Sequence, residues 1–144
     1  MNFKKEIVCI CDETEIIKFI FEDKKVISIV IIFKLKQLTI EMMRLINAHI
    51  HKIIKETDTS TYNTGMYLDI RNIKFASLEV IREQALFTKK MQEEQNSFHR
   101  LGFLMNNIVK HLLDAVFKIS PIKKCETKNF INPIECWKYI TFSE

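Results

Sequence analysis

The sequence predicts an α/β fold in which a mixed sheet of about five or six strands packs against about four helices. Two observations lead to this fold class. Short apolar runs alternate with longer segments whose apolar residues recur every three or four positions, as in strands that alternate with amphipathic helices. The chain also has only two glycines and two prolines, too few for the many tight turns of an all-β sandwich or barrel. The predicted order is β-β-β-α-β-α-β-α-β-α.

Length and composition indicate a single domain spanning residues 1–144. The hydrophobic fraction is 47% and the charged fraction 28%, as in ordinary globular proteins, and 144 residues leave room for one sizeable core. The longest apolar stretch, Val26–Phe33, is far shorter than the roughly 20 residues of a transmembrane helix. We therefore expect no integral membrane association. No signal peptide precedes the first structured run, so we expect a cytoplasmic protein.

The charge pattern argues against a nucleic-acid partner. Lys and Arg number 22 against 18 Asp and Glu, a net charge of +4, and Lys and Glu alternate through most of the chain. Dedicated nucleic-acid binders usually concentrate their basic residues on one face. The densest basic stretch comprises Lys118, Lys123, Lys124 and Lys128. We interpret it as a solvated face in preference to an anion-binding patch.

The first third of the chain is predicted to form three strands, at residues 7–11, 15–21 and 26–34. The third run is almost continuously apolar, as expected for a strand that is covered on both faces. The linkers between these strands are short and polar, which favours antiparallel neighbours.

Residues 39–56 then predict an amphipathic helix with one buried face. Its apolar stripe comprises Met42, Met43, Ile46, Ile50, Ile53 and Ile54. Its other side, expected to face solvent, comprises Arg44, Asn47, His51 and Lys55.

A strand at residues 66–70 is followed by Ser77, which is placed to cap a helix that runs to about Glu94. The inner face of this helix is predicted to hold Leu78, Ile81, Ala85, Thr88 and Met91, with Phe87 at the margin. The outer face is predicted to hold Glu79, Arg82, Glu83, Lys89, Lys90 and Glu93.

The next strand, at residues 98–105, contains Gly102, which suggests the close approach of another element. A helix that begins at Asn106 or Asn107 and ends at Ile119 is expected to follow.

The chain closes with a weaker strand at residues 123–130 and a helix. Asn132 as N-cap and Pro133 at the first position predict the start of this helix. We expect it to bury Trp137 and Ile140.

Three segments carry a resemblance to a known family. Tyr67-Leu68-Asp69-Ile70 followed by Ile73-Lys74-Phe75 is an apolar run that enters a helix at a serine. The strand at residues 98–105 opens the next βα unit, and residues 129–140 (NFINPIECWKYI) end a strand with Phe and continue into a Glu-small-Trp helix. In this order, over about residues 15–140, the chain resembles the STAS domains of bacterial anti-sigma-factor antagonists, and in particular small stand-alone STAS-like bacterial proteins. The resemblance implies a regulatory module whose partner is another protein.

The segment before the second helix departs from that family. Phosphorylatable antagonists carry Asp-Ser-Ser-Gly there, whereas this chain has Phe75-Ala76-Ser77-Leu78. Ser77 is a phosphorylation candidate, because the helix N-terminus would stabilise a phosphate. The interpretation that we favour is a helix cap, which contributes about 1 kcal/mol.

The cysteines and histidines have no metal-site or redox spacing. Cys9 and Cys11 form a C-x-C, and Cys125 and Cys136 fall in different predicted elements. We expect reduced, mostly buried thiols. The histidines, at His49, His51, His99 and His111, show no ligand pair and no evident carboxylate partner. We therefore expect no metal, no cofactor and no catalytic residues, and hence a protein that is not an enzyme.

Asp69 is the strongest candidate for a ligand-binding residue. It is predicted near the C-terminal end of a central strand, where α/β folds place ligand sites. Arg71 and Arg82 would form an anion clamp that Asp69 organises. The interpretation that we favour is structural, with Asp69 capping a turn and the arginines paired with Glu79 and Glu83 on the surface.

The sequence thus favours a non-enzymatic interaction module that docks through the loop and helix starting near Ser77. The expected partner-binding residues are Ser77, Glu79, Arg82, Glu83 and Lys89. A homodimer through an exposed edge strand or an apolar helix margin also fits the pattern. The alternative is a carrier of a small anionic or lipid-like ligand, with Asp69, Arg71 and Arg82 around a cavity of at least about 300 Å³.

Overall fold

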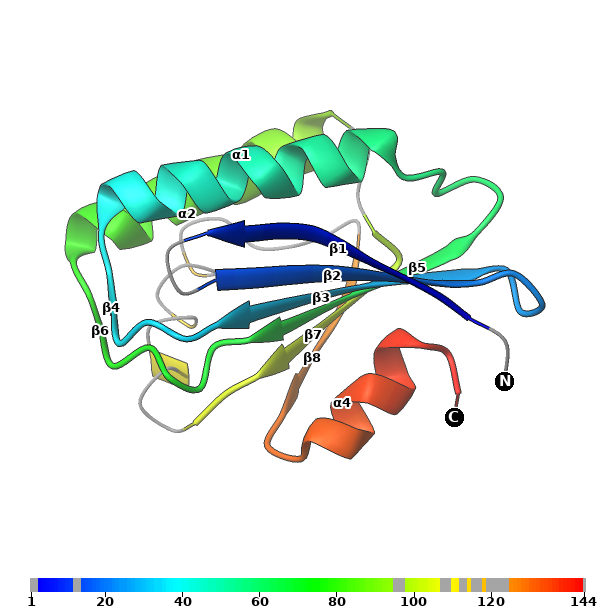
Figure 1. Cartoon of the computed structure of the whole chain (residues 1–144). Helices are drawn as coiled ribbons and strands as arrows, with labels where there is room; N and C mark the ends of the chain where they lie inside the picture. The colour runs from blue at the N-terminus through cyan, green and yellow to red at the C-terminus, as the bar shows by residue number, and fades with distance from the viewer. Residues whose placement is uncertain are drawn as a thin grey trace.

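The central element of the computed structural model is a mixed sheet in the order β1-β2-β3-β5-β7-β8 (Figure 1). The structure describes residues 3–11, 14–94, 98–106, 110, 111, 114, 118 and 125–143. The strands of the sheet are β1 (Lys4–Cys11), β2 (Thr14–Phe21), β3 (Val26–Phe33), β5 (Asn63–Asp69), β7 (Arg100–Leu104) and β8 (Glu126–Phe130). The first strand begins at Lys4, three residues before its predicted start at Ile7.

Strand direction follows from the connections. β1, β2 and β3 are antiparallel, as the short linkers predicted. β3, β5, β7 and β8 are parallel, which requires a crossover between each pair. β3 is buried along almost its whole length, with Ile32 half-buried, so the prediction of a strand covered on both faces is confirmed.

Three helices with described bounds cover the two faces of the sheet. α1 (Ile40–Glu56) and α2 (Leu78–Glu93) lie side by side on one face, and α4 (Pro133–Ile140) lies on the other (Figure 1). Asn132 accepts hydrogen bonds from the backbone N–H groups of Ile134 and Glu135, at 2.8 and 3.4 Å, and is the predicted N-cap of α4.

The helix predicted from Asn106 or Asn107 to Ile119 falls mostly outside the described residues. Four of its positions are described as helical, and these are Lys110, His111, Asp114 and Lys118. The first part of the strand predicted at residues 123–130 is likewise outside them, and its described part is β8.

Two short strands were not predicted. β4 (Gln37–Leu38) and β6 (Phe75–Ala76) form a separate two-stranded parallel sheet just before α1 and α2. A two-residue strand is too short for a period, so no pattern in the sequence marks it.

The C-terminal end of α4 makes the closest contact between a helix and the sheet. Gly65 and Gly102 lie beneath it on β5 and β7. A Cβ atom at Gly65 would overlap the carbonyl group of Ile140, and one at Gly102 would lie 2.8 Å from the Sγ of Cys136. The buried Ser28 hydroxyl donates to the same Ile140 carbonyl oxygen at 3.2 Å. The close approach predicted at Gly102 is confirmed, and both glycines of the chain serve it.

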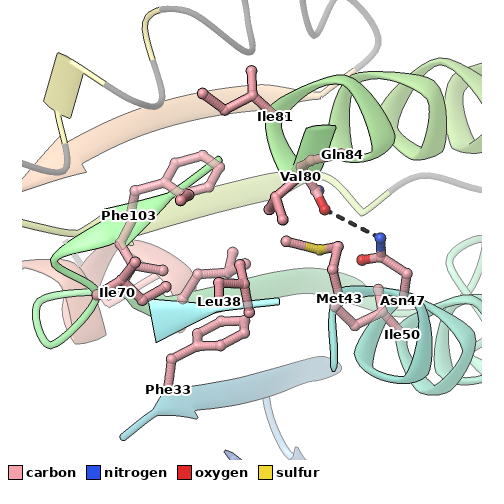
Figure 2. A pocket seen from close by; sticks show the side chains of 13 residues that line it. Phe33, Leu38, Met43, Asn47, Ile50, Ile70, Val80, Ile81, Gln84 and Phe103 are labelled. Carbon is pink, nitrogen blue, oxygen red and sulfur yellow. Dashed lines mark hydrogen bonds between the residues drawn. The ribbon is translucent and has the colours of Figure 1, made fainter. Parts of the chain in front are cut away.

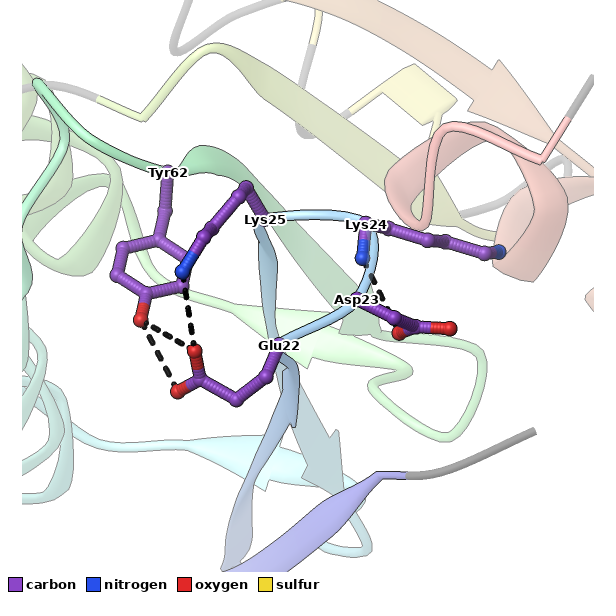
Figure 3. A network of polar contacts seen from close by, with 5 residues as sticks. All are labelled: Glu22, Asp23, Lys24, Lys25 and Tyr62. Atoms are coloured by element: carbon purple, nitrogen blue, oxygen red, sulfur yellow. Dashed lines mark hydrogen bonds and ion pairs between the residues drawn. The ribbon is translucent and has the colours of Figure 1, made fainter.

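The opposite end of the sheet from β4 and β6 is held by a polar network on the β2–β3 turn (Figure 3). The Tyr62 hydroxyl donates to both carboxylate oxygens of Glu22, at 3.0 and 2.9 Å. This hydrogen bond, with that of Lys25, holds the pKa of Glu22 below its ordinary value. Lys25 has a left-handed backbone, with φ of 55°, and its ammonium group lies 5.4 Å from the centre of the Tyr62 ring. The network fixes the turn to the loop that leaves α1.

We predict that Gly65→Ala destabilises the fold by about 3 kcal/mol, since the added methyl group meets backbone that is not free to move. Gly102→Ala should cost about 1–2 kcal/mol, because its neighbours are side-chain atoms of Cys136 and Ile140. The check is the free energy of unfolding from urea titration. Equal costs for the two variants would contradict this account of the α4 contact.

Candidate functional site

The segment that leads into α2 is held by the small β4–β6 sheet. Gln37 pairs with Phe75 and Leu38 with Ala76. The backbone N–H groups of Lys74 and Phe75 both donate to the carbonyl of Lys36, at 2.7 and 3.2 Å. The starts of α1 and α2 are therefore fastened to each other (Figure 1).

Ser77 caps α2, as predicted. Its hydroxyl oxygen accepts a hydrogen bond from the N–H of Val80 at 3.2 Å, and its carbonyl accepts from Ile81 at 3.1 Å. Glu79 adds an acidic side chain to the first turn, where the helix dipole favours it. The hydroxyl is half-buried. Phosphorylation of Ser77 stays a prediction.

The outer face of α2 carries most of the predicted partner-binding residues. Glu79, Arg82 and Lys89 are exposed. Glu83 is half-buried because its Oε1 accepts a hydrogen bond from the Nε of Arg44 on α1 at 3.0 Å. The structure therefore places Glu83 between the helices, and the other three on the open side.

Exposed apolar side chains that were not predicted lie on α2 and on β6 just before it. Leu78 was predicted to point inward, but it is 59% exposed, and the buried residue of that turn is Val80. Leu86 is 65% exposed, and Phe75 on β6 is 55% exposed. Apolar residues occur on more than one side of α2, so their spacing alone did not determine which side faces the core. We call the surface formed by Phe75, Leu78, Arg82 and Leu86 the α2 surface.

A row of polar pairs joins α1 to α2. Besides Arg44–Glu83, the amide of Asn47 donates to Gln84 at 3.2 Å, and His51 Nε2 lies 2.8 Å from Glu94 Oε2. Asn47 was predicted to face solvent but is only 6% exposed, and His51 is half-buried. The expectation for Asn47 was wrong because α2 covers this side of α1, and the same cover makes His51 a boundary residue. The carboxylate beside His51 comes from a residue distant in sequence, so local spacing gave no sign of it.

A small cavity lies under this row, between the helix pair and the sheet (Figure 2). Its volume is about 100 Å³, well below the roughly 300 Å³ expected for a carrier. Its walls are mostly apolar, with Asn47 and Gln84 as the polar pair. The lining residues are Phe33, Leu38, Met43, Asn47, Ile50, Leu68, Ile70, Ile73, Ala76, Val80, Ile81, Gln84 and Phe103. The cavity therefore gives no support to the carrier hypothesis.

The proposed anion clamp is not assembled in the structure. Asp69 ends the central strand β5, as predicted, and holds Arg71 with two hydrogen bonds, Nε–Oδ1 at 3.0 Å and Nη2–Oδ2 at 2.8 Å. Asp69 also accepts from the Arg71 backbone N–H at 3.3 Å, so it caps the turn. Strand alternation places the Asp69 side chain on the α4 side with Tyr67. Arg82 lies on α2, which covers the other face.

The described cysteines Cys125 and Cys136 and the histidine His99 are placed for structural roles. Burial raises the pKa of the Cys125 and Cys136 thiols to about 12, which makes them weak nucleophiles. His99 Nδ1 lies 3.1 Å from the backbone nitrogen of Thr64 and 2.9 Å from its hydroxyl. The side chains of Cys9 and Cys11 fall outside the described residues. Within the described ranges, no three His, Cys, Asp or Glu side chains converge as metal ligands would.

Within the described residues, the parallel strands do not form the crevice at a reversal of strand order where open α/β sheets bind ligands. β3, β5, β7 and β8 follow one another in a single direction across the sheet. Ligand crevices of open α/β sheets lie where the strand order reverses. In the part of the chain that the structure describes, no helix is long and apolar enough to cross a membrane.

Comparison with known proteins identifies the fold. No protein-family model matches the chain, and no curated protein matches it in sequence. Among solved structures, the chain is similar to an uncharacterised protein of the DUF3478 family from Shewanella loihica PV-4, described as having a SpoIIAA-like fold. The TM-score is 0.56 at 12% identity, over 94% of this chain and 99% of that chain.

The protein is therefore a mixed α/β chain with a SpoIIAA-like fold, which is the STAS fold. The resemblance drawn from the sequence is confirmed at the level of the fold.

The His51–Glu94 pair predicts a pH dependence of stability. The hydrogen bond from His51 lowers the pKa of Glu94 from its ordinary 4.5. A carboxyl group with a lowered folded pKa stabilises the fold above its unfolded pKa, and this contribution is lost as the pH falls through the folded pKa. The wild type should therefore lose more stability than Glu94→Gln as the pH falls below 4.5.

The pH profile of stability is measured as the urea midpoint of unfolding from neutral to acidic pH. Glu93→Gln changes an exposed neighbouring carboxyl group and is the matched control, which should follow the wild type. A Glu94→Gln profile parallel to that of the wild type would contradict the prediction.

Proposed function

We propose that this chain is a non-enzymatic, regulatory protein-interaction module that docks a partner protein through the α2 surface. The observation that carries the proposal is the exposure of Leu78 and Leu86 one helical turn on either side of the exposed Arg82, with Phe75 exposed on the strand just before this helix. Large exposed apolar side chains rimmed by charged ones mark interaction sites, because their burial against a partner removes apolar area from water.

Two residue types on this surface, Arg and Phe, are enriched in protein interfaces. Arg82 lies one helical turn from Leu78 and one from Leu86, so an arginine stands between two exposed leucines. Arginine and aromatic residues are enriched at the centres of interfaces, and charged residues at the rim select the partner. Glu79 and Lys89, at the two ends of this stretch, supply rim charges of opposite sign.

The surface is also rigid, which favours docking. The β4–β6 ladder and the Ser77 cap fix Phe75 and Leu78 before a partner arrives. A surface that is already ordered loses little conformational entropy on binding. The SpoIIAA-like fold is consistent with this proposal, since STAS domains are generally interaction modules.

A binding role also agrees with the described chemistry. The described thiols are protonated at neutral pH, since their pKa values are about 12, and the carboxylate of Asp69 is engaged by Arg71.

A phosphate on Ser77 would lie at the edge of the α2 surface and beside Glu79, where it would change the charge that a partner meets.

We predict that the double variant Leu78→Ser/Leu86→Ser, and separately Arg82→Glu, each lose at least about tenfold in partner binding, because truncation or charge reversal removes central contacts. The measurement is affinity capture from the native cell at low salt, quantified by mass spectrometry against the wild type. The unfolding midpoint of each variant should stay near the wild-type value, since these side chains are exposed.

Matched controls lie on α4, on the other face of the sheet. Ile134→Ser removes an exposed aliphatic side chain, and Lys138→Glu reverses an exposed charge. Both controls should retain the partner. Equal capture by the α2 variants and the controls, or no specific capture by the wild type, would refute the proposal.

A further inference from the structure

The open edge of the sheet at β1 has an unusual charge pattern. In the part of the chain that the structure describes, β2 is the only strand that pairs with β1. Their register is regular from Lys4 opposite Ile20 to Ile7 opposite Ile17, and it shifts between Ile7 and Cys9. Residues 3–7, which we call the β1 edge segment, comprise the regular stretch Lys4–Ile7 and Phe3 just before it, and no described strand pairs with the outer backbone groups of this stretch.

The side chains of the β1 edge segment divide cleanly between the two faces of the sheet. Phe3 and Ile7 are 53% and 60% exposed, and Phe3 lies 5.8 Å from the rings of both Phe19 and Phe21. Lys4 and Glu6 share the other face, where they form an ion pair at 3.1 Å. Lys5 is exposed between Phe3 and Ile7.

We propose that a second copy of this chain pairs with the β1 edge segment, antiparallel, about a twofold axis at Lys5. Antiparallel pairing about residue 5 places residues 3 and 7 opposite each other, and likewise residues 4 and 6. Phe3 then meets the partner's Ile7, and Lys4 meets the partner's Glu6. The segment Phe-Lys-Lys-Glu-Ile is thus complementary to itself on both faces.

The pairing also continues the side-chain rows of the existing sheet. Glu6 lies opposite Lys18 on β2, so the dimer creates a row of Lys18, Glu6 and the partner's Lys4, in which the charges alternate. On the other face, Ile17 lies opposite Ile7, and the partner's Phe3 extends this apolar row. Cross-strand pairs of both kinds stabilise antiparallel sheets.

The pair formed by the two Lys5 side chains opposes this register. Like charges directly opposite each other destabilise a sheet, and edge lysines commonly prevent unrelated strands from pairing. Here the edge charges exclude a foreign strand, whereas a second copy supplies Glu6 for each Lys4. Lys5 opposite its own copy is therefore the one unfavourable pair among five. Replacing Lys5 with a neutral residue tests this register, because it should strengthen the pairing.

Charge-reversal variants in a sedimentation-velocity concentration series test the proposal. Lys4→Glu and Glu6→Lys should each weaken self-association about tenfold, because each converts both Lys4–Glu6 pairs into like-charge pairs. An equimolar mixture of the two variants should associate again, since their edges are then opposite in charge. Lys5→Thr should strengthen self-association about two- to fivefold.

Lys52→Glu and Glu56→Lys make the same changes in net charge at exposed sites on α1 and should leave association unchanged. Circular dichroism verifies that each variant is folded. If Glu6→Lys fails to fold because it places a lysine opposite Lys18 on β2, the two single variants Lys4→Glu and Lys5→Thr suffice for the test. Three results would overturn the proposal. The wild type could stay monomeric at all concentrations, the β1 charge variants could associate as well as the wild type, or Leu78→Ser/Leu86→Ser could be the variant that loses association.

Discussion

The fold depends on the contact in which the last turn of α4 presses its backbone against two parallel strands. Side chains normally separate the backbone of a helix from the sheet that it covers, but here Gly65 and Gly102 leave no Cβ in the way. Ser28, which lies opposite Gly65 on the adjacent strand, satisfies the Ile140 carbonyl that this approach would otherwise bury without a partner. The helix thereby closes one face of β3, β5 and β7, while α1 and α2 close the other.

Features set by nearby residues could be predicted from the sequence. The caps at Ser77 and Asn132 follow from the residue types at the two helix starts. The strand at Val26–Phe33 follows from its continuous apolar run. Gly102 signals close packing because glycine is otherwise unfavourable inside a strand. Each of these signals needs only a few neighbouring residues, and each agrees with the fold that resulted.

The errors arose where a residue's surroundings come from distant parts of the chain. Asn47 and His51 seemed solvent-facing because the α1 stripe alone cannot reveal that Gln84 and Glu94 lie beside them. Within the candidate site, the charged residues Glu79, Arg82 and Lys89 were placed correctly on the open side of α2. The exposure of its apolar members Leu78 and Leu86 could not be predicted, since it depends on the rotation of α2 about its own axis against the sheet. Asp69 was correctly predicted at its strand end as the cap of a turn, but its ion pair with Arg71 was missed, because the arginines were expected to pair with Glu79 and Glu83.

The β4–β6 ladder joins the segments that lead into the two long helices, α1 and α2. The backbone N–H groups of Lys74 and Phe75 both donate to the Lys36 carbonyl, so the segment that enters α2 is tied to the segment that enters α1. In the docking that we propose, a partner would therefore meet a surface whose backbone is already hydrogen-bonded, and the rate of association would be set by orientation and diffusion.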